Sequence, residues 1–258
     1  MASVKHSERI NHIYAILKQK GNASTSFLSK TFDVSESTIR RDVDFLASMR
    51  DEVERVHGGA VLRNARKDSE FMFELKQDLQ TDLKQRIASA LLEEIDDGDR
   101  LLLDSGTTCL YAAMQLHHHQ DLRVVTTDLK VADELAKHEN IESVIIGGLI
   151  RPGYYTIGEA LALEMLDHFS IEKTIMSADA IDIERGVSNF STFEVAIKKK
   201  IIDMADQSIL IADHTKFGKT SFYKVAELNR FACIITTREL DPTIAEALTA
   251  LGIRLRLA

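Results

Sequence analysis

Apolar positions recur in two ways along the second part of the chain. Leu79, Leu83, Ile87, Leu91 and Ile95 are spaced four residues apart, which predicts a helix with one apolar face. Short apolar runs predict buried strands at 101–103, 123–126, 143–146, 174–177, 208–212, 232–236 and 253–257. Helical stretches separate most of them, at 108–116, 129–138, 158–168, 192–205 and 241–252. This alternation predicts an α/β domain with a mostly parallel sheet that helices cover on both faces.

The first 62 residues have a different pattern, of three short helices and a hairpin. The first helix ends before Gly21, while Ser24 or Thr25 can cap a second helix and Ser35 a third. The apolar stripe of the third helix is Ile39, Val43 and Leu46. Residues 52–62 then alternate and include a glycine pair, as a short β-hairpin does.

Charge is divided unevenly between these two parts. The chain carries a net charge of −8 at pH 7, but residues 1–67 hold 12 Lys and Arg against 8 Asp and Glu, a net of +4. The rest holds 20 against 32, a net of −12. A basic head on an acidic body points to a nucleic-acid contact at one end, and an unevenly charged solvated surface is the alternative.

Composition excludes several classes of protein. With 45% hydrophobic and 28% charged residues, the chain is neither fibrous nor wholly disordered. No apolar run approaches the ~20 residues that cross a bilayer, and the polar start lacks the core of a signal peptide, so we expect a cytoplasmic protein that does not enter a membrane. Cys109 and Cys233 are the two cysteines, so we expect no disulfide framework, no metal site and no cofactor.

Small polar and basic residues gather at the start of the third helix. They are Ser35, Ser37, Thr38, Arg40 and Arg41. In a helix-turn-helix such groups enter the major groove, where arginine reads guanine and hydroxyl groups reach phosphates. The pattern predicts a contact with double-stranded operator DNA, and solvated surface arginines are the alternative.

Here the chain resembles the DeoR family of bacterial transcription regulators. The matching residues are Val34-Ser35-Glu36-Ser37-Thr38-Ile39-Arg40-Arg41-Asp42 and Arg55-Val56-His57-Gly58-Gly59-Ala60. The resemblance implies that the first motif opens a recognition helix and that the second forms a wing, with Arg55 and His57 at the DNA. The family usually has a glycine soon after the recognition helix, where this chain has Met49-Arg50-Asp51-Glu52. We therefore expect an irregular entry to the wing, with acidic side chains that weaken its phosphate contact.

Polar or glycine-rich segments follow six of the seven predicted strands, at 104–108, 126–128, 147–148, 177–179, 213–216 and 236–237. Open α/β sheets bind ligands outside the carboxyl ends of their strands. Gly106-Thr107-Thr108 leads into a helix, whose free N–H groups and positive dipole end suit a phosphate. Arg151 and Lys216 can supply positive charge. A small anionic polyol is the predicted ligand, and ordinary turn chemistry is the alternative.

The resemblance to the DeoR family covers nearly the whole chain. In this part it rests on Leu103-Asp104-Ser105-Gly106-Thr107-Thr108, Ile146-Gly147-Gly148 and Ala212-Asp213-His214-Thr215-Lys216-Phe217-Gly218. It implies a sensor domain similar to ribose-5-phosphate isomerase in fold, which binds a phosphorylated sugar and releases DNA. On the matching positions, Gly106, Thr107 and Thr108 would cradle the phosphate. The rest of the implied effector site is Asp104, Thr126, Thr127, Gly147, Gly148, Arg151, Asp179, Glu194 and Lys216.

Three further features have plain structural interpretations. Ser191-Thr192-Phe193-Glu194 fits a capping box, which is enough to explain Glu194. His117-His118-His119 points in different directions and predicts a solvated turn rather than a metal site. Asp96-Asp97-Gly98-Asp99 lacks the distal glutamate of a calcium loop and predicts a turn.

These observations divide the chain into a winged helix-turn-helix domain at 1–63, a linker at 64–80 and an α/β sugar-phosphate sensor domain at 81–258. The leading hypothesis is a repressor of a carbohydrate operon, not an enzyme, whose DNA affinity a phosphorylated sugar controls. Since one head covers a half-site, we expect a homodimer or homotetramer. One alternative is a sugar-phosphate isomerase-like enzyme with an appended DNA-binding head, in which Asp104, Asp179 or Glu194 would be the base. The other is a constitutive DNA-binding protein whose body only oligomerises.

Overall fold

The computed structural model describes residues 6–56, 58–62, 73, 76–77, 79–151 and 154–258. The chain divides into two compact units. One, the head, lies within residues 1–81 and 152–154, and the other, the body, comprises Asp82–Arg151 and Tyr155–Ala258. Each unit has a hydrophobic core of its own, and each is described by itself.

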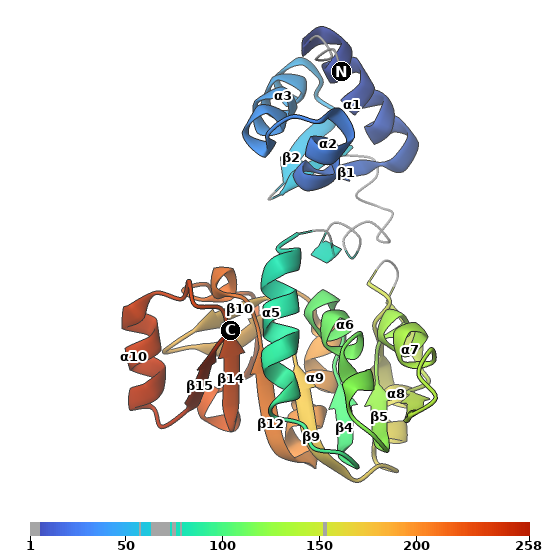
Figure 1. Cartoon of the computed structure of the whole chain (residues 1–258), viewed down its shortest axis with the longest axis vertical. Coiled ribbons are helices and arrows are strands. Elements are labelled where there is room, and N and C mark those ends of the chain that lie inside the picture. Colours follow the sequence, from blue (N-terminus) through green and yellow to red (C-terminus); the bar gives the residue numbers. More distant parts are fainter. Residues whose placement is uncertain (1–5, 57, 63–72, 74–75, 78, 152–153) are drawn as a thin grey trace. The chain divides into compact units, whose positions relative to one another are not determined.

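The head consists of three helices and a small antiparallel sheet (Figure 1). The helices are α1 (His6–Lys20), α2 (Thr25–Phe32) and α3 (Glu36–Met49). The sheet has the order β1-β3-β2, with β1 (Asn22–Ser24), β2 (Val53–Val56) and β3 (Gly59–Leu62). The hydroxyl groups of Ser24 and Ser35 cap α2 and α3 by accepting from the N–H groups of Phe27 and Thr38. The predicted order of three helices and a hairpin is confirmed, and β1 is an unpredicted addition.

The turn between α3 and β2 packs back onto α1. The Glu52 carboxylate accepts a hydrogen bond from the Tyr14 hydroxyl and lies 3.0 Å from the Lys18 amino group. The Arg50 guanidinium lies over the Tyr14 ring, 3.8 Å from its centroid. The β2–β3 ladder that follows pairs without a bulge. The expected irregularity at the entry does not extend into the hairpin ladder, and the charge of Glu52 is paired within the head.

A buried ion pair joins α1 to α3. Arg9 Nε lies 2.5 Å from Asp42 Oδ2, and a second guanidinium nitrogen lies 3.2 Å from Oδ1. Asp42 is 1% exposed and Arg9 is 6% exposed. Since both carboxylate oxygens are held by one planar guanidinium, the pair fixes how α3 is rotated against the core.

We expect Asp42→Leu to lower the free energy of unfolding of the head by about 3–5 kcal/mol, because it leaves the Arg9 guanidinium buried without its carboxylate. The double variant Arg9→Met/Asp42→Leu removes both charges and should recover most of the loss. Amide hydrogen exchange in α3 measures the head separately from the body. The matched control is Asp44→Leu, because Asp44 is about half exposed and pairs with Arg55 at the surface, where such pairs contribute less than about 1 kcal/mol. An equal loss in the control would contradict the prediction.

The body is a doubly wound α/β fold around a seven-stranded parallel sheet of order β15-β14-β12-β9-β4-β5-β6. Its strands are β4 (Arg100–Leu103), β5 (Leu122–Thr126), β6 (Ile141–Ile145), β9 (Ile171–Met176), β12 (Ala205–Ile211), β14 (Cys233–Thr236) and β15 (Arg254–Leu257). Each of the seven predicted strands is present. The predicted fold class, a small winged helix-turn-helix domain followed by a mostly parallel α/β domain, is confirmed.

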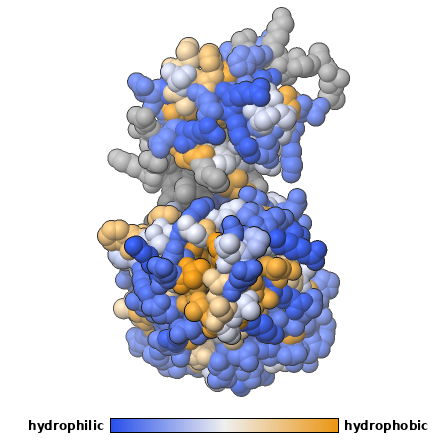
Figure 2. All heavy atoms as spheres, turned by 90° about the vertical axis from the view of Figure 1, so that its left-hand side faces the viewer, coloured by the Kyte–Doolittle hydropathy of each residue, from blue (hydrophilic) through white to orange (hydrophobic). Residues whose placement is uncertain are grey.

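Helices cover both faces of this sheet (Figure 1). In the view of Figure 1, the front layer is α5 (Thr81–Leu92), α6 (Thr107–Ala113) and α7 (Leu129–Leu135). The other helices of the body are α8 (Glu159–Leu166), α9 (Thr192–Met204) and α10 (Pro242–Ala250), with short 3-10 helices at Leu116–His118, His214–Lys216 and Leu228–Arg230. Among the described residues, no helix is both long enough and apolar enough to span a bilayer. Hydrophobic residues gather on the side that carries α10 and β15 (Figure 2), where Leu251 and Leu257 are 50% and 44% exposed.

Two small antiparallel sheets accompany the main one and were not predicted. One has the order β10-β11-β13, with β10 (Ala180–Asp182), β11 (Gly186–Asn189) and β13 (Tyr223–Ala226). The other is the hairpin of β7 (Leu149–Ile150) and β8 (Ile157–Gly158). Both matter below, because β7 leads to Arg151 and β11 ends in Asn189.

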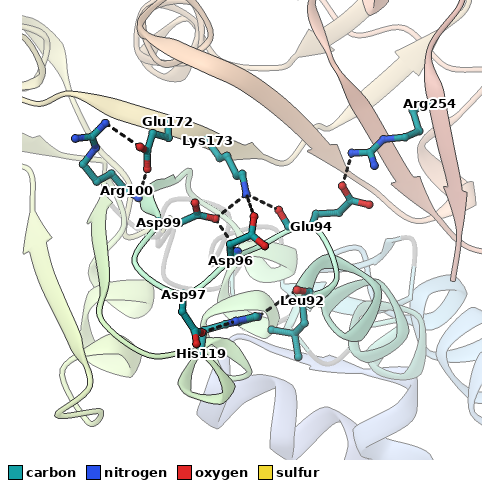
Figure 3. Close-up of polar contacts among 10 residues, drawn as sticks. All are labelled: Leu92, Glu94, Asp96, Asp97, Asp99, Arg100, His119, Glu172, Lys173 and Arg254. Carbon is teal, nitrogen blue, oxygen red and sulfur yellow. Dashed lines mark hydrogen bonds and ion pairs between the residues drawn. The ribbon is translucent and has the colours of Figure 1, made fainter.

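Ion pairs occupy the amino ends of the central strands (Figure 3). The Lys173 amino group of β9 lies 2.7 Å from the Asp99 carboxylate and 3.1 Å from that of Asp96. The predicted turn at 96–99 is therefore confirmed. His117 and His118 of the histidine triplet are exposed, in keeping with the predicted solvated turn. His119 is instead partly buried and lies 3.1 Å from Asp97 and 3.1 Å from the carbonyl oxygen of Leu92.

Candidate functional site

The residues predicted to contact DNA lie on the outer side of α3. Ser37, Arg40 and Arg41 are exposed and Thr38 is half-buried. The Ser35 hydroxyl, which caps the helix, lies 2.8 Å and 2.9 Å from the hydroxyl groups of Ser37 and Thr38. The opposite side packs into the core of the head through Ile39, Val43 and Leu46. One face of α3 is thus apolar and buried, and the other presents hydroxyl and guanidinium groups.

The arginines of this surface differ in their contacts. Arg40 lies 3.0 Å from Glu36 one turn earlier, and Arg55 of β2 lies 2.6 Å from Asp44. Arg41 has no ion-pair partner within the described part of the chain. Exposed pairs of this kind contribute less than about 1 kcal/mol, so a phosphate or a guanine can replace the carboxylate. His57 lies outside the described residues.

The body has its topological switch point between β4 and β9. These strands are neighbours, but the chain continues from β4 toward β5 and β6 and from β9 toward β12. Ligands of open α/β sheets bind outside the carboxyl ends of the strands at such a point. Here the Ser177 N–H donates to Asp104 Oδ2 at 3.3 Å, and the Ser177 hydroxyl donates to the Ser105 carbonyl oxygen at 2.8 Å. The loops that follow the two strands therefore brace each other.

Gly106 begins the segment predicted to cradle a phosphate. Its φ of +112° favours glycine, and an added Cβ would stand 3.0 Å from the Ser177 hydroxyl. Thr107 and Thr108 follow it in the first turn of α6 and are 7% and 8% exposed. The N–H group of Gly106 donates to Asp128 Oδ2 at 3.1 Å. One of the backbone donors predicted for a phosphate is thus taken by a carboxylate of this chain.

Asp128 also caps α7. Its Oδ1 accepts from the N–H groups of Lys130 and Val131 at 2.8 Å and 3.2 Å. The side chain is fully buried. Burial raises the pKa of Asp128 to about 6, although the backbone donors act in the opposite direction.

Four alternating charges connect the switch point to the β7–β8 hairpin. The buried Lys198 amino group of α9 contacts Asp104 and lies 2.9 Å from the Ser177 carbonyl oxygen. Glu194, one helical turn earlier, contacts the Arg151 guanidinium. We call Asp104, Lys198, Glu194 and Arg151 the charge network. Burial lowers the pKa of Lys198, but the charges of Asp104 and Glu194 outweigh it, so that the pKa lies above its ordinary value.

Glu194 does more than cap a helix. The Ser191 hydroxyl accepts from the Phe193 N–H at 3.3 Å, as predicted for the cap. The Glu194 carboxylate, however, binds Arg151 through Oε1 and accepts from Asn189 Nδ2 at 2.9 Å through Oε2. Capping alone, the alternative interpretation of Glu194, therefore does not account for its contacts.

Lys198 and Asn189 were missed by the sequence analysis. Lys198 stands in a run of three lysines that is typical of a solvated surface. A signal was present, because Glu194, Ile197, Lys198 and Ile201 recur at the spacing of one helix face. Asn189 ends β11, a strand of four residues that was not predicted.

The remaining predicted residues are spread along the side of the sheet where its strands have their carboxyl ends. We call this side the carboxyl edge. Thr126 and Thr127 at the end of β5 are fully buried, and Asp179 accepts from the Phe190 N–H at 3.4 Å. Lys216 follows β12, whereas Gly147 follows β6. From β12 to β6 there are four strand spacings, about 19 Å, so these two predicted site residues follow strands that lie far apart in the sheet.

Backbone packing alone explains why position 148 is a glycine. Its φ is +154°, and an added Cβ would stand 2.7 Å from the carbonyl oxygen of Gly158 in β8. The close approach of β7 and β8 therefore requires glycine there, whether or not a ligand binds.

Cys109 lies on α6, behind the candidate cradle. It is fully buried, with Sγ 4.0 Å from the Ile175 carbonyl oxygen. Burial raises the pKa of the Cys109 thiol well above its ordinary value. The thiol therefore stays protonated, which makes it a poor nucleophile.

The raised pKa of Asp128 predicts a specific pH dependence. Because its pKa in the folded state lies above the ordinary value, the penalty for ionising Asp128 is absent below about pH 4 and complete above about pH 6. Between pH 5 and pH 8 the wild type should therefore lose about 1–2 kcal/mol more stability than Asp128→Asn. Urea unfolding of both proteins across this range measures the difference. Parallel pH profiles would contradict the assignment.

Comparisons with known proteins cover both units. Residues 9–66 match the model of the DeoR-like helix-turn-helix domain, and residues 79–238 match that of the DeoR C-terminal sensor domain. A transcriptional regulator of the sgc region of Escherichia coli (strain K12) is 38% identical over 99% of this chain and 98% of its own length. The glycerol-3-phosphate regulon repressor of the same organism is 32% identical over 98% of this chain and 100% of its own. A solved D-ribose-5-phosphate isomerase is similar over 53% of this chain and 54% of its own, at 19% identity and a TM-score of 0.41.

Proposed function

Because the chain belongs to the DeoR family of transcriptional regulators, we propose that it represses a carbohydrate operon and that a phosphorylated sugar controls its affinity for operator DNA. The observation that carries the proposal is the combination, in one chain, of the polar outer face of α3 with the polar carboxyl edge at the sheet's switch point. The first supplies guanidinium and hydroxyl groups to a DNA groove. The second offers hydroxyl groups, backbone N–H groups and a guanidinium to a phosphorylated polyol.

Control of DNA binding by the sugar follows from linkage. A sugar phosphate that binds better to a form of the protein that fits the operator poorly lowers the population of the form that fits it well. A coupling free energy of about 1–3 kcal/mol changes the DNA affinity roughly 5–150-fold. One head covers a half-site, so the regulator acts as a homodimer or homotetramer in the cytoplasm. The exposed apolar residues Leu251 and Leu257 support self-association of the body.

The arrangement of Asp104 favours binding over turnover. A general base must reach the proton that it removes. Asp104 is 1% exposed, and its Oδ2 is engaged by the Lys198 amino group and the Ser177 N–H. These contacts engage Asp104 within the chain and support a regulator that releases its ligand unchanged.

For the head, we expect Arg40→Ala and Arg41→Ala each to weaken operator binding by at least about 1 kcal/mol, because each removes a base or phosphate contact. The operator is a fragment selected from random-sequence DNA by the wild-type protein, and fluorescence anisotropy at fixed salt gives the affinities. Arg123→Ala is the matched control, since Arg123 is an exposed arginine in an ion pair on the body. Unchanged titrations for both α3 variants would remove the arginines from the interface.

For the body, we expect a phosphorylated sugar to stabilise the full chain and Thr107→Val to abolish this effect while operator binding is retained. A ligand at 100 times its dissociation constant stabilises the native state by about 2.7 kcal/mol, which a thermal-shift screen of sugar phosphates and their unphosphorylated parents detects. Thr249→Val, on the exposed face of α10, is the matched control. A normal shift in the Thr107 variant would show that the phosphate binds elsewhere, and no shift with any compound would contradict sugar-phosphate control.

A further inference from the structure

Three buried side chains at the carboxyl edge keep a polar atom without a hydrogen-bond partner among the described residues. They are Asn189, through Oδ1, and Thr127 and Thr236, through Oγ1. Asn189 is 2% exposed and Thr127 is fully buried. A buried polar atom that stays unpaired costs about 1–3 kcal/mol, so native proteins rarely keep one without a bound partner. An atom of this kind at the carboxyl edge can take a polar partner from outside the chain.

The position of Asn189 connects it to three residues of the predicted effector site. Its Nδ2 donates to Glu194 Oε2 at 2.9 Å, and the other oxygen of that carboxylate contacts Arg151. The next residue along the chain, Phe190, donates its N–H to Asp179 at 3.4 Å. Asn189 therefore stands among predicted site residues, although no sequence motif indicated it.

The contact with Glu194 decides which atom of the Asn189 amide is free. A carboxylate only accepts hydrogen bonds, so the NH2 group of the amide must face Glu194. Arg151 holds the carboxylate from its other side. The amide cannot turn over without placing two acceptors against each other, and its carbonyl oxygen is thus the end that remains unpaired.

We infer that Asn189 Oδ1 accepts a hydrogen bond from a hydroxyl group of the effector, on the part of that molecule away from its phosphate. This inference rests on the proposed sugar-phosphate control. A phosphate dianion only accepts hydrogen bonds, so it cannot pair with Oδ1 or with Glu194. Asn189 therefore selects phosphorylated compounds that carry a hydroxyl donor and gives no affinity to the phosphate group itself. A site built around an acceptor that must be paired discriminates strongly against ligands without the matching donor.

The test compares binding of a sugar phosphate with binding of inorganic phosphate. The probes for the full-length chain are inorganic phosphate, D-fructose 6-phosphate, D-glucose 6-phosphate, D-ribose 5-phosphate and sn-glycerol 3-phosphate, measured by calorimetry. The variant is Asn189→Leu, which keeps the volume and removes the acceptor. We expect at least a tenfold rise in the dissociation constant of the organic phosphate that the wild type binds most tightly. The constant for inorganic phosphate should change less than twofold.

Two further variants make the comparison specific. Asn229→Leu is the matched control, because Asn229 is exposed and distant in sequence from the site, and it should bind all five probes like the wild type. Asn189→Ser keeps a small polar side chain. It replaces Asn189→Leu in the binding measurements if the leucine variant does not fold. It should show a loss in the same direction.

The outcomes separate the inference from the proposed function. An unchanged organic-phosphate affinity in both Asn189 variants, with the wild type still preferring that compound over inorganic phosphate, overturns the inference alone. An equal loss for the organic and inorganic probes also overturns it, because Asn189 would then act through the integrity of the whole site. A wild type that binds none of the four organic phosphates better than inorganic phosphate overturns the proposed function, and the inference with it.

Discussion

A single buried ammonium group holds the carboxyl edge of the body together. Removing a lysine charge from water is unfavourable by several kcal/mol unless the charge is paired and hydrogen-bonded. Lys198 meets this condition through Asp104 and the Ser177 carbonyl oxygen, with Glu194 one turn away on the same helix. The loop after β4, the loop after β9 and the start of α9 therefore have to keep their places for Lys198 to stay buried. The geometry of the candidate effector site depends on this constraint.

The head uses the same principle for a different purpose. There the buried pair is Arg9 and Asp42, and it sets the rotation of α3 rather than the shape of a ligand site. Buried ion pairs often add little net stability compared with apolar residues of the same volume. What both pairs provide is a fixed position, because a buried charge is tolerated only while its partners stay in place. In each unit the orientation-sensitive element is thus anchored from the inside, and its outer polar groups are left to contact other molecules.

The main sheet could be predicted from the sequence, whereas the centre of the site could be predicted only in part. The central strands of the seven-stranded sheet contain short apolar runs, because both faces of a parallel sheet are buried, whereas the edge strand β15 has the sequence Arg-Leu-Arg-Leu. The strands of the β10-β11-β13 sheet and the β7–β8 hairpin have two to four residues and lack the longer apolar runs of strands such as β4 and β14. Asp104, Glu194 and Arg151 were identified from the polar segments and the family resemblance. Lys198 and Asn189 were not, because their roles depend on contacts between elements that are distant in the chain.

Because Cys109 of α6 is buried, the reaction of its thiol with a reagent can report an opening of that helix. Its sulfur lies behind the segment that begins with Gly106, and its thiol is shielded from solvent and kept protonated. A thiol reagent can modify it only when α6 separates from the sheet, so the rate of modification counts the openings of that helix. In the folded body this thiol is also shielded from mild oxidants. The chain thus carries an internal reporter for any ligand that closes or loosens the edge of its sheet.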